Sequence, residues 1–313
     1  MNAAIAQTGR VRAAVLCDWG GSRLRAFLDV AGRVTAQASG PGIARLGGQS
    51  PATVLQQTLA PWSAEADIEV VVLCGMAGSR TGLAEVPYLR APADADTCWA
   101  AARAVRDGKW SVSILPGIQA RNFRDAADVM RGEETQIFGA LQLQAALAQG
   151  RRMLVLPGTH SKWVEVRDGR IARLQTYLTG ELFDLLSTQS SLLRLGGAAG
   201  ADEDAFEIGV RNAARHDLAA SLFETRSAQL VEDRSAGWAR AFLSGLLIGA
   251  EVRSMLETPN VPGGELTLIG DPQLTRRYQR ALRLFDVPGQ SLDGDVCVLA
   301  GLRAAAHHFR KES

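Results

Sequence analysis

Hydrophobic and polar positions along the chain first predict three consecutive strands. The runs 11–17, 24–30 and 34–39 have the length and composition of strands, and Ala31-Gly32 forms the connection between the second and the third. Strands that are joined by such short connections pair antiparallel. The beginning of the chain is therefore predicted to be a β-meander.

A helix and a buried strand are predicted after the meander. Ser50-Pro51 is an N-cap and first-turn pair, which indicates a helix from there to about Ala60. The run IEVVVLC over 68–74 is so uniformly apolar that we expect a strand buried on both faces. The same patterns predict a helix over 94–105, a strand over 110–115 and a helix from 132 to about 148.

The order of the opening elements returns in the second half of the chain. Strands are predicted over 152–156, 162–166 and 170–177, with a polar turn after the first and an Asp168-Gly169 hairpin turn after the second. Sequence identity between the two copies is negligible, so what repeats is the order of elements. The remaining predicted elements are helices over 180–193, 202–215, 218–230 and 237–257, a strand over 265–269, a helix over 273–285 and a last helix from about 295.

This repetition predicts an α/β fold of two similarly built domains. A chain of 313 residues is too long for one ordinary core, which also favours two domains. We expect them to occupy residues 1–150 and 151–313, with the last helix able to pack on the first domain. No low-complexity linker separates the two halves, so we expect the domains to abut directly.

Composition and charge restrict the partners of the protein. Hydrophobic residues make up 47% of the chain and charged residues 21%, the balance of a folded globular protein. The formal net charge of +1 provides no overall attraction to nucleic acid or to anionic lipid, so we expect neither as a partner. An anionic ligand must therefore be held by a local site.

Cysteine spacing and the N-terminus bear on the compartment. Cys17, Cys74, Cys98 and Cys297 lie far apart without a C-x-x-C pair, which favours buried free thiols over metal ligands or a disulfide. The N-terminus lacks a charged segment followed by an apolar core, and no apolar run approaches the ~20 residues that span a bilayer. We therefore expect a cytoplasmic protein.

Candidate chemistry begins at the turn DWGGSR. Gly20 and Gly21 let backbone N–H groups approach an anion, Ser22 adds a hydroxyl and Arg23 a positive charge. Asp18, at the end of the strand, could orient Mg²⁺ directly or through water. The alternative is an ordinary hairpin with a turn-stabilising aspartate, and the turn taken alone favours that alternative.

The turn PGTHSK stands at the matching place in the second meander. Gly158 provides the same backbone freedom, Thr159 and Ser161 provide two hydroxyls, and Lys162 provides a positive charge. Two such turns could hold a polyphosphate from both sides, so their coincidence favours phosphate binding for each. His160 is interpreted as a structural residue of the turn.

Between the two turns, DVMRGEETQ stands at the start of a predicted helix. Carboxylates in a first turn are favoured by the helix dipole, which is a structural explanation for Glu133 and Glu134. The functional interpretation is that one of them, or Asp128, accepts the proton of an attacking hydroxyl during phosphoryl transfer. Arg131 could hold a substrate carboxylate or pair with a neighbouring acid.

Taken together, these stretches resemble a known family. The signature stretches of the 2-dehydro-3-deoxygalactonokinases are matched, in family order from residue 13 to about 305, by DWGGSRLRA, CGMAGSRTGLAEVPYL, ILPGI, DVMRGEETQIFGAL, LPGTHSKWV, TGELFDLL and LSGLLIGAEV. The resemblance implies two ribonuclease-H-like domains of the actin-like ATPase superfamily with a cleft for ATP and Mg²⁺ between them. It also implies transfer of the γ-phosphate to the C6 hydroxyl of 2-dehydro-3-deoxy-D-galactonate, a step of galactonate catabolism.

The resemblance assigns roles at the nucleotide. Asp18, as the Mg²⁺ residue, and Gly20 to Ser22 match the first phosphate hairpin of the family, and Arg23 stands where a small or amide residue is expected. The second hairpin is matched by Gly158, Thr159, Ser161 and Lys162. Gly270-Asp271 is similar to the adenosine segment, although related kinases often have Gly-Gly where this chain has Gly-Asp-Pro.

The resemblance also orders the candidates for the catalytic base. Sugar kinases of the superfamily often place an Asp after Asn at this helix start, where this chain has Gly132-Glu133. Glu133 is therefore the first candidate, followed by Glu134 and Asp128.

The sugar acid needs donors for its carboxylate. Arg80, in a loop after a buried strand, is the first candidate, ahead of Arg45 and Arg131, because arginine meets a carboxylate with two parallel hydrogen bonds. A surface salt bridge is the alternative for each of them. Further substrate-binding candidates are Ser79 in the same loop and, from the second domain, Thr179 and Glu181.

Two other functions stay open at this point. One is a kinase of the same fold for another 2-keto-3-deoxy acid or a neutral sugar. The other is an ATP-operated binding protein without phosphoryl transfer, against which stand the compact length and the lack of an appended peptide-binding domain. The expected partners are a sugar acid and ATP, and a homodimer is left open.

Overall fold

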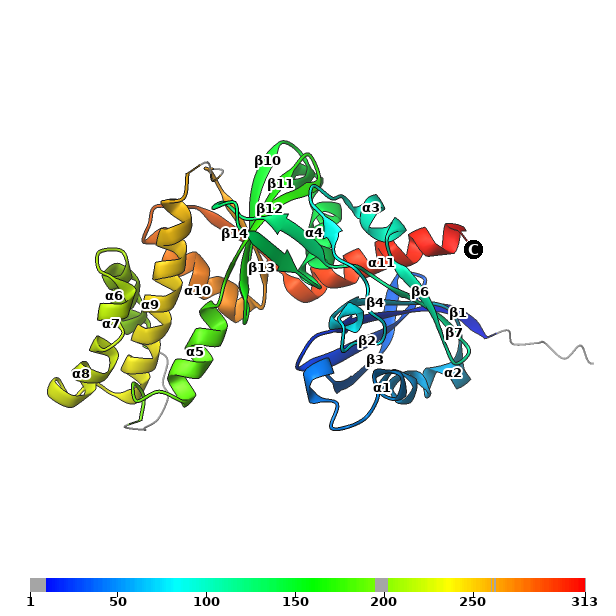
Figure 1. Ribbon diagram of the computed structural model, residues 1–313, viewed down its shortest axis with the longest axis horizontal. Helices are drawn as coiled ribbons and strands as arrows, with labels where there is room; N and C mark the ends of the chain where they lie inside the picture. Colours follow the sequence, from blue (N-terminus) through cyan, green and yellow to red (C-terminus); the bar gives the residue numbers. More distant parts are fainter. Residues whose placement is uncertain (1–9, 195–201, 260, 262, 313) are drawn as a thin grey trace, which may run out of the picture. The chain divides into compact units, whose positions relative to one another are not determined.

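The computed structural model describes residues 10–194, 202–259, 261 and 263–312 (Figure 1). Residues 1–9, to which the expectation about a targeting segment applies, lie outside the described residues. Two compact units divide the chain. Unit 1 contains the residues up to Gln119, residues 129–145 and those from Val296 onward, and unit 2 contains residues 120–128 and 146–295. The predicted domain boundary at residue 150 stays a prediction.

Unit 1 is built on a six-stranded sheet in the order β3-β2-β1-β4-β7-β6. Its strands are β1 Val11–Trp19, β2 Arg23–Val30, β3 Arg33–Pro41, β4 Ala66–Gly75, β6 Arg103–Asp107 and β7 Trp110–Ile114. Strands β1, β2 and β3 pair antiparallel and form the predicted meander. Strand β4 pairs parallel with β1, and β7 pairs parallel with β4.

The helices of unit 1 connect and follow these strands. They are the 3₁₀ helices η1 Ile43–Arg45 and η2 Met76–Gly78, and the α-helices α1 Pro51–Leu59, α2 Trp62–Glu65, α3 Ala95–Ala100, α4 Glu133–Leu143 and, from Val296 onward, α11 Gly294–Glu312. The Ser50 hydroxyl accepts a hydrogen bond from Thr53 N at 3.1 Å, so the predicted N-cap of α1 is confirmed.

Unit 2 is built on a five-stranded sheet in the order β12-β11-β10-β13-β14. Its strands are β10 Arg151–Leu156, β11 Ser161–Arg167, β12 Arg170–Tyr177, β13 Leu266–Gly270 and β14 Gly289–Asp293. Its helices are η3 Ala145–Ala148, which begins at the last residue of unit 1, α5 Thr179–Thr188, α6 Glu203–Ala213, α7 Leu218–Ser221, α8 Glu224–Val231, α9 Ala236–Leu256 and α10 Pro272–Arg283.

The two sheets repeat one strand order. In each, an antiparallel meander is followed by two strands that pair parallel, β4 and β7 in unit 1 and β13 and β14 in unit 2. The tight turns Ala31-Gly32 and Asp168-Gly169 both have positive φ angles, as two-residue hairpin turns require. The predicted α/β fold of two similarly built, ribonuclease-H-like units is confirmed.

Several local predictions are wrong. The predicted helix over 94–105 ends at Ala100, because residues 103–107 pair as β6 with β7 across a turn at Gly108. Pairing with a neighbouring strand there overrides the helical pattern of the sequence. The helix predicted over 218–230 is two helices, α7 and α8, and the helix predicted to about 148 ends at Leu143.

Besides β6, four strands were not predicted. One is β14, and the others form a small sheet in the order β5-β8-β9, from Leu89–Arg90, Ile118–Arg121 and Ala127–Met130. These strands are short, and the three of the small sheet carry exposed positions, so no hydrophobic run marks them. Strands β8 and β9 contain residues at which the chain passes from unit 1 to unit 2 and back.

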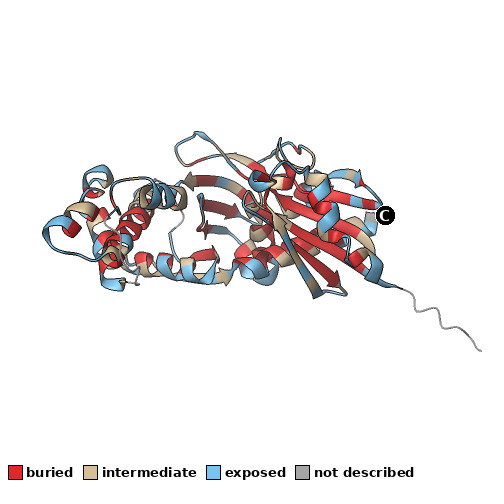
Figure 2. Cartoon of the chain, turned by 90° about the horizontal axis from the view of Figure 1, so that it is seen from below, coloured by how far each residue is buried: buried red, intermediate tan, exposed pale blue. Residues whose placement is uncertain are grey.

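Each unit has a core on its own sheet, and Figure 2 shows the strands as the most continuously buried elements. Trp19, Leu55 and Leu73 belong to the core of unit 1, and Trp163 and Leu268 to that of unit 2. Cys17, Cys74, Cys98 and Cys297 are buried and unbridged, which confirms the prediction of free thiols. Burial raises the pKa of the first three thiols.

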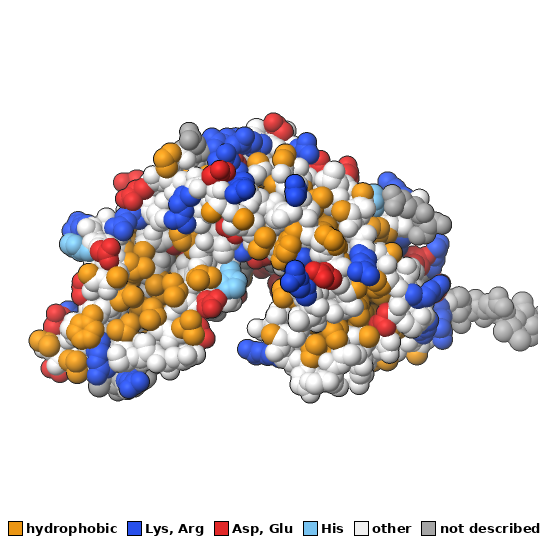
Figure 3. Space-filling model, in the orientation of Figure 1, with side chains coloured by type: hydrophobic (Ala, Val, Ile, Leu, Met, Phe, Trp, Pro, Cys, Tyr) orange, Lys and Arg blue, Asp and Glu red, His pale blue; other side chains and the backbone are white. Residues whose placement is uncertain are grey.

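The outer surface carries charges of both signs. Figure 3 shows Lys and Arg side chains interspersed with Asp and Glu over the visible face, in keeping with a formal net charge of +1. Among the described residues, no helix is both long enough and apolar enough to cross a membrane.

Candidate active site

The turn between β1 and β2 offers free backbone donors. Trp19 is fully buried and its indole N–H donates to Pro41 O at 3.0 Å, while Gly20 N donates to Arg23 O at 3.0 Å and closes the turn. Within the described part of the chain, the N–H groups of Gly21 and Ser22 meet no protein acceptor. Ser22 is exposed, so these two donors can reach an anion from solvent.

Asp18 lies beside this turn and pairs across the strands. Its Oδ2 accepts from Arg25 Nη2 at 2.5 Å, and the two residues stand opposite each other in the β1–β2 register. Arg25, not the exposed Arg23, is thus the arginine that contacts Asp18. No cluster of three or more possible metal-ligating side chains occurs in the described residues. One carboxylate suits Mg²⁺ that arrives with nucleotide phosphates, because protein magnesium sites commonly use one or two carboxylates plus phosphate oxygens.

Three glycine-containing segments of unit 1 meet at the carboxyl ends of β1 and β4. Trp19 stands beside Gly75 in the parallel pairing of the two strands. Gly132, at the start of α4, has a φ of 112°, and a Cβ there would lie 3.2 Å from Gly75 Cα. Ligands of α/β sheets bind outside the carboxyl ends of parallel strands. Asp18 and the acidic start of α4 therefore stand at one edge of one sheet.

The two glutamates at the start of α4 differ in access. Glu133 is half-buried, and its Oε2 accepts from Arg131 N at 3.0 Å. Glu134 is fully buried, and its carboxylate accepts from Gly132 N at 2.7 and 2.9 Å. Burial, followed by the charge of Glu133, raises the pKa of Glu134 to about 8, although hydrogen bonds and Arg131 oppose the rise. Glu133 is thus the more accessible of the two carboxylates.

The three arginine candidates have different surroundings. The Arg131 guanidinium stacks on the Tyr88 ring at 4.2 Å and donates to Val86 O at 2.9 Å. Its Nε and Nη1 are buried and have no partner among the described residues. Arg80 is exposed and pairs with Glu85 at 3.2 Å, and Arg45 is exposed at the end of η1.

Ser79 lies beside Arg80 in the loop after β4. It is half-buried, and its hydroxyl lies 3.4 Å from the Thr81 hydroxyl. The pairing of Arg80 with Glu85 is weak because both side chains are largely exposed. Arg80 can therefore exchange this partner for a substrate carboxylate.

The turn between β10 and β11 repeats the free donors in unit 2. Within the described residues, the N–H groups of Gly158, Thr159 and His160 donate to no protein acceptor. Glu181 N donates to Thr159 O at 2.9 Å, and a Cβ at Gly180 would lie 2.4 Å from Gly158 O. The start of α5 therefore packs directly against the turn and holds its shape.

Two polar side chains of this turn, those of His160 and Ser161, contact other residues of the protein. His160 Nε2 and Glu181 Oε2 lie 2.5 Å apart, and both side chains are exposed. Ser161 is fully buried and donates its hydroxyl hydrogen to Glu251 at 2.6 Å. A serine hydroxyl has one hydrogen, so Ser161 cannot also donate to phosphate in this geometry.

Lys162 and Asp128 meet through one threonine. Lys162 Nζ donates to Thr176 Oγ1 at 2.9 Å, and that hydroxyl donates to Asp128 Oδ1 at 2.6 Å. Thr176 N donates to Asp128 Oδ2 at 2.7 Å. Both Asp128 oxygens thus accept hydrogen bonds, which points to a positioning role for this carboxylate.

A cavity of about 250 Å³ lies in unit 2 beside the turn between β10 and β11, which we call the second turn. It is lined by Gly158 and Thr159 of the turn, Thr179, Gly180 and Phe183 of α5, Ser244, Leu247 and Ile248 of α9, and Leu274, Arg277 and Tyr278 of α10. Apolar walls with a few polar groups are typical of sites for small organic ligands.

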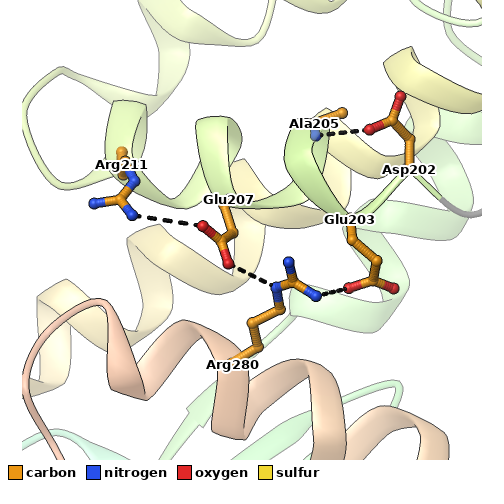
Figure 4. A network of polar contacts seen from close by, with 6 residues as sticks. All are labelled: Asp202, Glu203, Ala205, Glu207, Arg211 and Arg280. Atoms are coloured by element: carbon orange, nitrogen blue, oxygen red, sulfur yellow. Dashed lines mark hydrogen bonds and ion pairs between the residues drawn. The ribbon is translucent and has the colours of Figure 1, made fainter.

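Helix α10 forms one wall of this cavity and is anchored at both ends. Asp271 Oδ1 accepts from Gln273 N and Leu274 N, so this aspartate is the N-cap, with Pro272 as the first helical residue. Gly270 ends β13 immediately before it. Figure 4 shows Arg280 of α10 between Glu203 and Glu207 of α6, at 2.5 and 2.8 Å. The Gly-Asp-Pro sequence thus serves to start the helix.

Comparison with known proteins decides the family. The family whose model matches residues 18–305 is 2-keto-3-deoxy-galactonokinase. The chain is 36% identical over 296 residues to the probable 2-dehydro-3-deoxygalactonokinase of Rhizobium meliloti, covering 92% of this chain and 95% of the relative. It is 35% identical over 298 residues to the 2-dehydro-3-deoxygalactonokinase of Escherichia coli, covering 94% and 97%.

The chain belongs to the 2-keto-3-deoxy-galactonokinase family. A crystal structure assigned to the 2-dehydro-3-deoxygalactonokinases, from Sinorhizobium meliloti, matches with a TM-score of 0.85 and 35% identity over 95% of this chain and 99% of the other. The resemblance inferred from the sequence is confirmed, and with it the interpretation as a sugar-acid kinase that uses ATP.

The structure of this member of the family adds residues that the motifs did not indicate. Glu251 binds the buried Ser161, Thr176 links Lys162 to Asp128, and Arg25 pairs with Asp18. Glu251 had one usable signal, because it is an acidic residue inside the apolar helical run LSGLLIGAEV. Which residues pair with Lys162 and Asp18 depends on strand register, so no pattern of neighbouring residues in the sequence predicts these pairs.

Proposed function

We propose that the protein transfers the γ-phosphate of ATP to the C6 hydroxyl of 2-dehydro-3-deoxy-D-galactonate, as a step of galactonate catabolism. The observation that carries the proposal is the pair of similarly placed turns, one in each unit, that present free N–H groups. Free backbone donors in a turn are a recurrent phosphate-binding device. Membership of the family supports the sugar acid as acceptor.

In this proposal ATP is bound by both turns. The N–H groups of Gly21 and Ser22 and those from Gly158 to His160 bind phosphate oxygens, with Gly20 shaping the first turn and Arg23 adding charge. Asp18 would hold Mg²⁺, which when bound neutralises charge on the transferred phosphate. The base and ribose occupy the cavity of unit 2, one wall of which is α10, the helix that Asp271 caps.

The remaining polar residues of unit 2 act on the nucleotide indirectly. Lys162 supplies positive charge near the second turn, and Thr176 and Asp128 hold its ammonium group in place. Ser161 fixes the start of β11 through its bond to a buried carboxylate. In unit 2, therefore, the backbone N–H groups of the turn between β10 and β11 are the direct phosphate ligands.

For the sugar acid, we propose that Glu133 accepts the proton of the C6 hydroxyl, because it is the accessible carboxylate at the start of α4. Glu134 stays behind it as a buried neighbour. Arg80, with Arg45 and Ser79, binds the carboxylate and hydroxyls of the sugar acid, and Thr179 and Glu181 stand at the start of α5 for further contacts. Arg131 holds the loop that contains Val86 against α4.

The proposed acceptor is tested with a panel of substrates. Purified protein with ATP and Mg²⁺ is assayed for ADP release with 2-dehydro-3-deoxy-D-galactonate, with the gluconate-derived epimer and with neutral hexoses. We expect higher kcat/KM values for the keto-deoxy acids than for neutral hexoses, because a cationic site binds the carboxylate that neutral sugars lack. Membership of the family leads us to expect the highest value for the galactonate-derived acid. Turnover of neutral hexoses without turnover of either keto-deoxy acid would reject the proposal.

The nucleotide cavity is tested with Ser244→Leu on α9. Ser244 is 6% exposed and lines the cavity, so leucine occupies space that we assign to the nucleotide. We expect the KM for ATP to rise about tenfold or more. The KM for the sugar acid, measured at saturating ATP, serves as the control and should stay within about twofold. An unchanged KM for ATP would place the nucleotide elsewhere.

We also propose that the protein resides in the cytoplasm and forms a homodimer. Four buried, unbridged cysteines suit a reducing compartment, where thiols stay reduced. Light scattering of the purified protein measures the number of copies in solution.

A further inference from the structure

One buried carboxylate of unit 2, Glu251, enters the function proposed above only as the acceptor of the Ser161 hydroxyl. Glu251 lies on α9, one helical turn after Leu247 and Ile248, which line the nucleotide cavity. The residue is 2% exposed. A buried glutamate is costly unless hydrogen bonds compensate its charge, so the groups around it indicate its purpose.

Four donors from three other elements converge on Glu251. Its Oε1 accepts from the Ser161 hydroxyl at 2.6 Å and from Trp163 Nε1 at 2.7 Å, both on β11. Its Oε2 accepts from the Tyr278 hydroxyl of α10 at 2.8 Å and from the Thr179 hydroxyl of α5. Burial raises the pKa of this carboxyl, and these hydrogen bonds oppose the rise.

These partners coincide with the walls of the cavity. Thr179 and Tyr278 line it directly, and Ser161 begins the strand that leaves the second turn. Each hydroxyl has donated its hydrogen to Glu251, so its orientation is set and its lone pairs remain for other contacts. One side chain thereby holds the second turn, α5 and α10 to α9.

We propose that Glu251 is a positioning residue that keeps the nucleotide cavity in its binding geometry. This inference rests on the proposed function, because it assumes that ATP occupies that cavity. Glu251 does not line the cavity, so it acts through Ser161, Thr179 and Tyr278.

The test compares Glu251→Gln with the wild type in steady-state kinetics. Glutamine keeps the volume but has one acceptor oxygen, so at least one side of the network loses its acceptor. We expect the KM for ATP to rise about tenfold or more, with the KM for the sugar acid changed less than about twofold. A generally weakened fold would not separate the two KM values.

Glu165→Gln is the matched control. Glu165 is also a buried glutamate of unit 2, but its partners are Arg151 and Arg167 at the other end of β11. We expect this variant to melt at a lower temperature and to keep both KM values. If Glu251→Gln and Glu165→Gln lose thermal stability equally and neither changes the KM for ATP, Glu251 is structural and the inference is wrong.

Tyr278→Phe covers the case in which Glu251→Gln does not fold. It removes one of the four donors without opening a cavity, and we expect the KM for ATP to rise a few-fold, about threefold. The Ser244→Leu variant separates the two proposals. If Ser244→Leu raises the KM for ATP but Tyr278→Phe and Glu251→Gln leave it unchanged, the role of Glu251 is wrong. If Ser244→Leu itself leaves the KM for ATP unchanged, the proposed nucleotide site is wrong.

Discussion

Replacing Glu133 with glutamine is expected to lower kcat for phosphoryl transfer by about 10²- to 10⁴-fold, the usual contribution of a general base. Glutamine cannot accept the proton of the attacking hydroxyl. Its amide oxygen can still accept from Arg131 N, as Glu133 Oε2 does at 3.0 Å, so the start of α4 should keep its shape. The kcat is measured at saturating ATP and sugar acid in a coupled assay for ADP.

Binding and folding provide the controls for this prediction. The KM for ATP and the melting temperature of Glu133→Gln should stay near the wild-type values, because the residue is half-buried and its hydrogen bond is retained. Near-normal turnover of Glu133→Gln would remove this residue as the base. Loss of turnover in Asp128→Asn at unchanged KM for ATP would then direct attention to Asp128.

Replacing Glu134 with glutamine is expected to change the pH dependence of stability. The pKa of Glu134 is raised to about 8 in the folded protein, mainly by burial. The folded state therefore holds this proton more tightly than the unfolded state, and stability falls as pH rises from near 4.5 through 8. The full shift corresponds to roughly 5 kcal/mol as an upper limit. Glutamine does not titrate, so the variant should not show this loss of stability as pH rises.

The measurement compares the melting temperatures of Glu134→Gln and the wild type below pH 4.5 and above pH 8. The melting temperature of the variant should rise relative to that of the wild type as pH rises, because glutamine places no charge at this buried position. Glu133→Gln is the matched control, since it removes the neighbouring carboxylate that solvent reaches and should keep most of the wild-type pH dependence. Parallel curves for Glu134→Gln and the wild type would show that Glu134 does not titrate in this range.

Local sequence patterns were sufficient for much of the fold. Both meanders, the Ala31-Gly32 and Asp168-Gly169 turns and the Ser50 cap follow from side-chain periodicity and backbone preference over a few residues. The repeated order of elements was visible for the same reason. Strand β6 was missed because its pairing with β7 depends on neighbours outside a local window.

The two turns of the candidate site were likewise visible as motifs. Asp18, Gly21 and Gly158 were recognisable as candidates, because the phosphate and magnesium sites of proteins use a small set of residue types in tight turns. Ser161 shows where this reasoning stops. Its hydroxyl suggested a phosphate donor, but the fold buries it and directs its hydrogen to Glu251.

By itself, the sequence determined the two β-meanders, the positions of the glycine turns and the family. The tertiary structure decided which polar side chains are available to a ligand and which are used within the protein. Asp128 meets Thr176 across 48 residues of chain, and Glu251 collects four donors that lie 27 to 90 residues away. Such contacts depend on register and helix packing, which bring distant residues together and leave no local pattern.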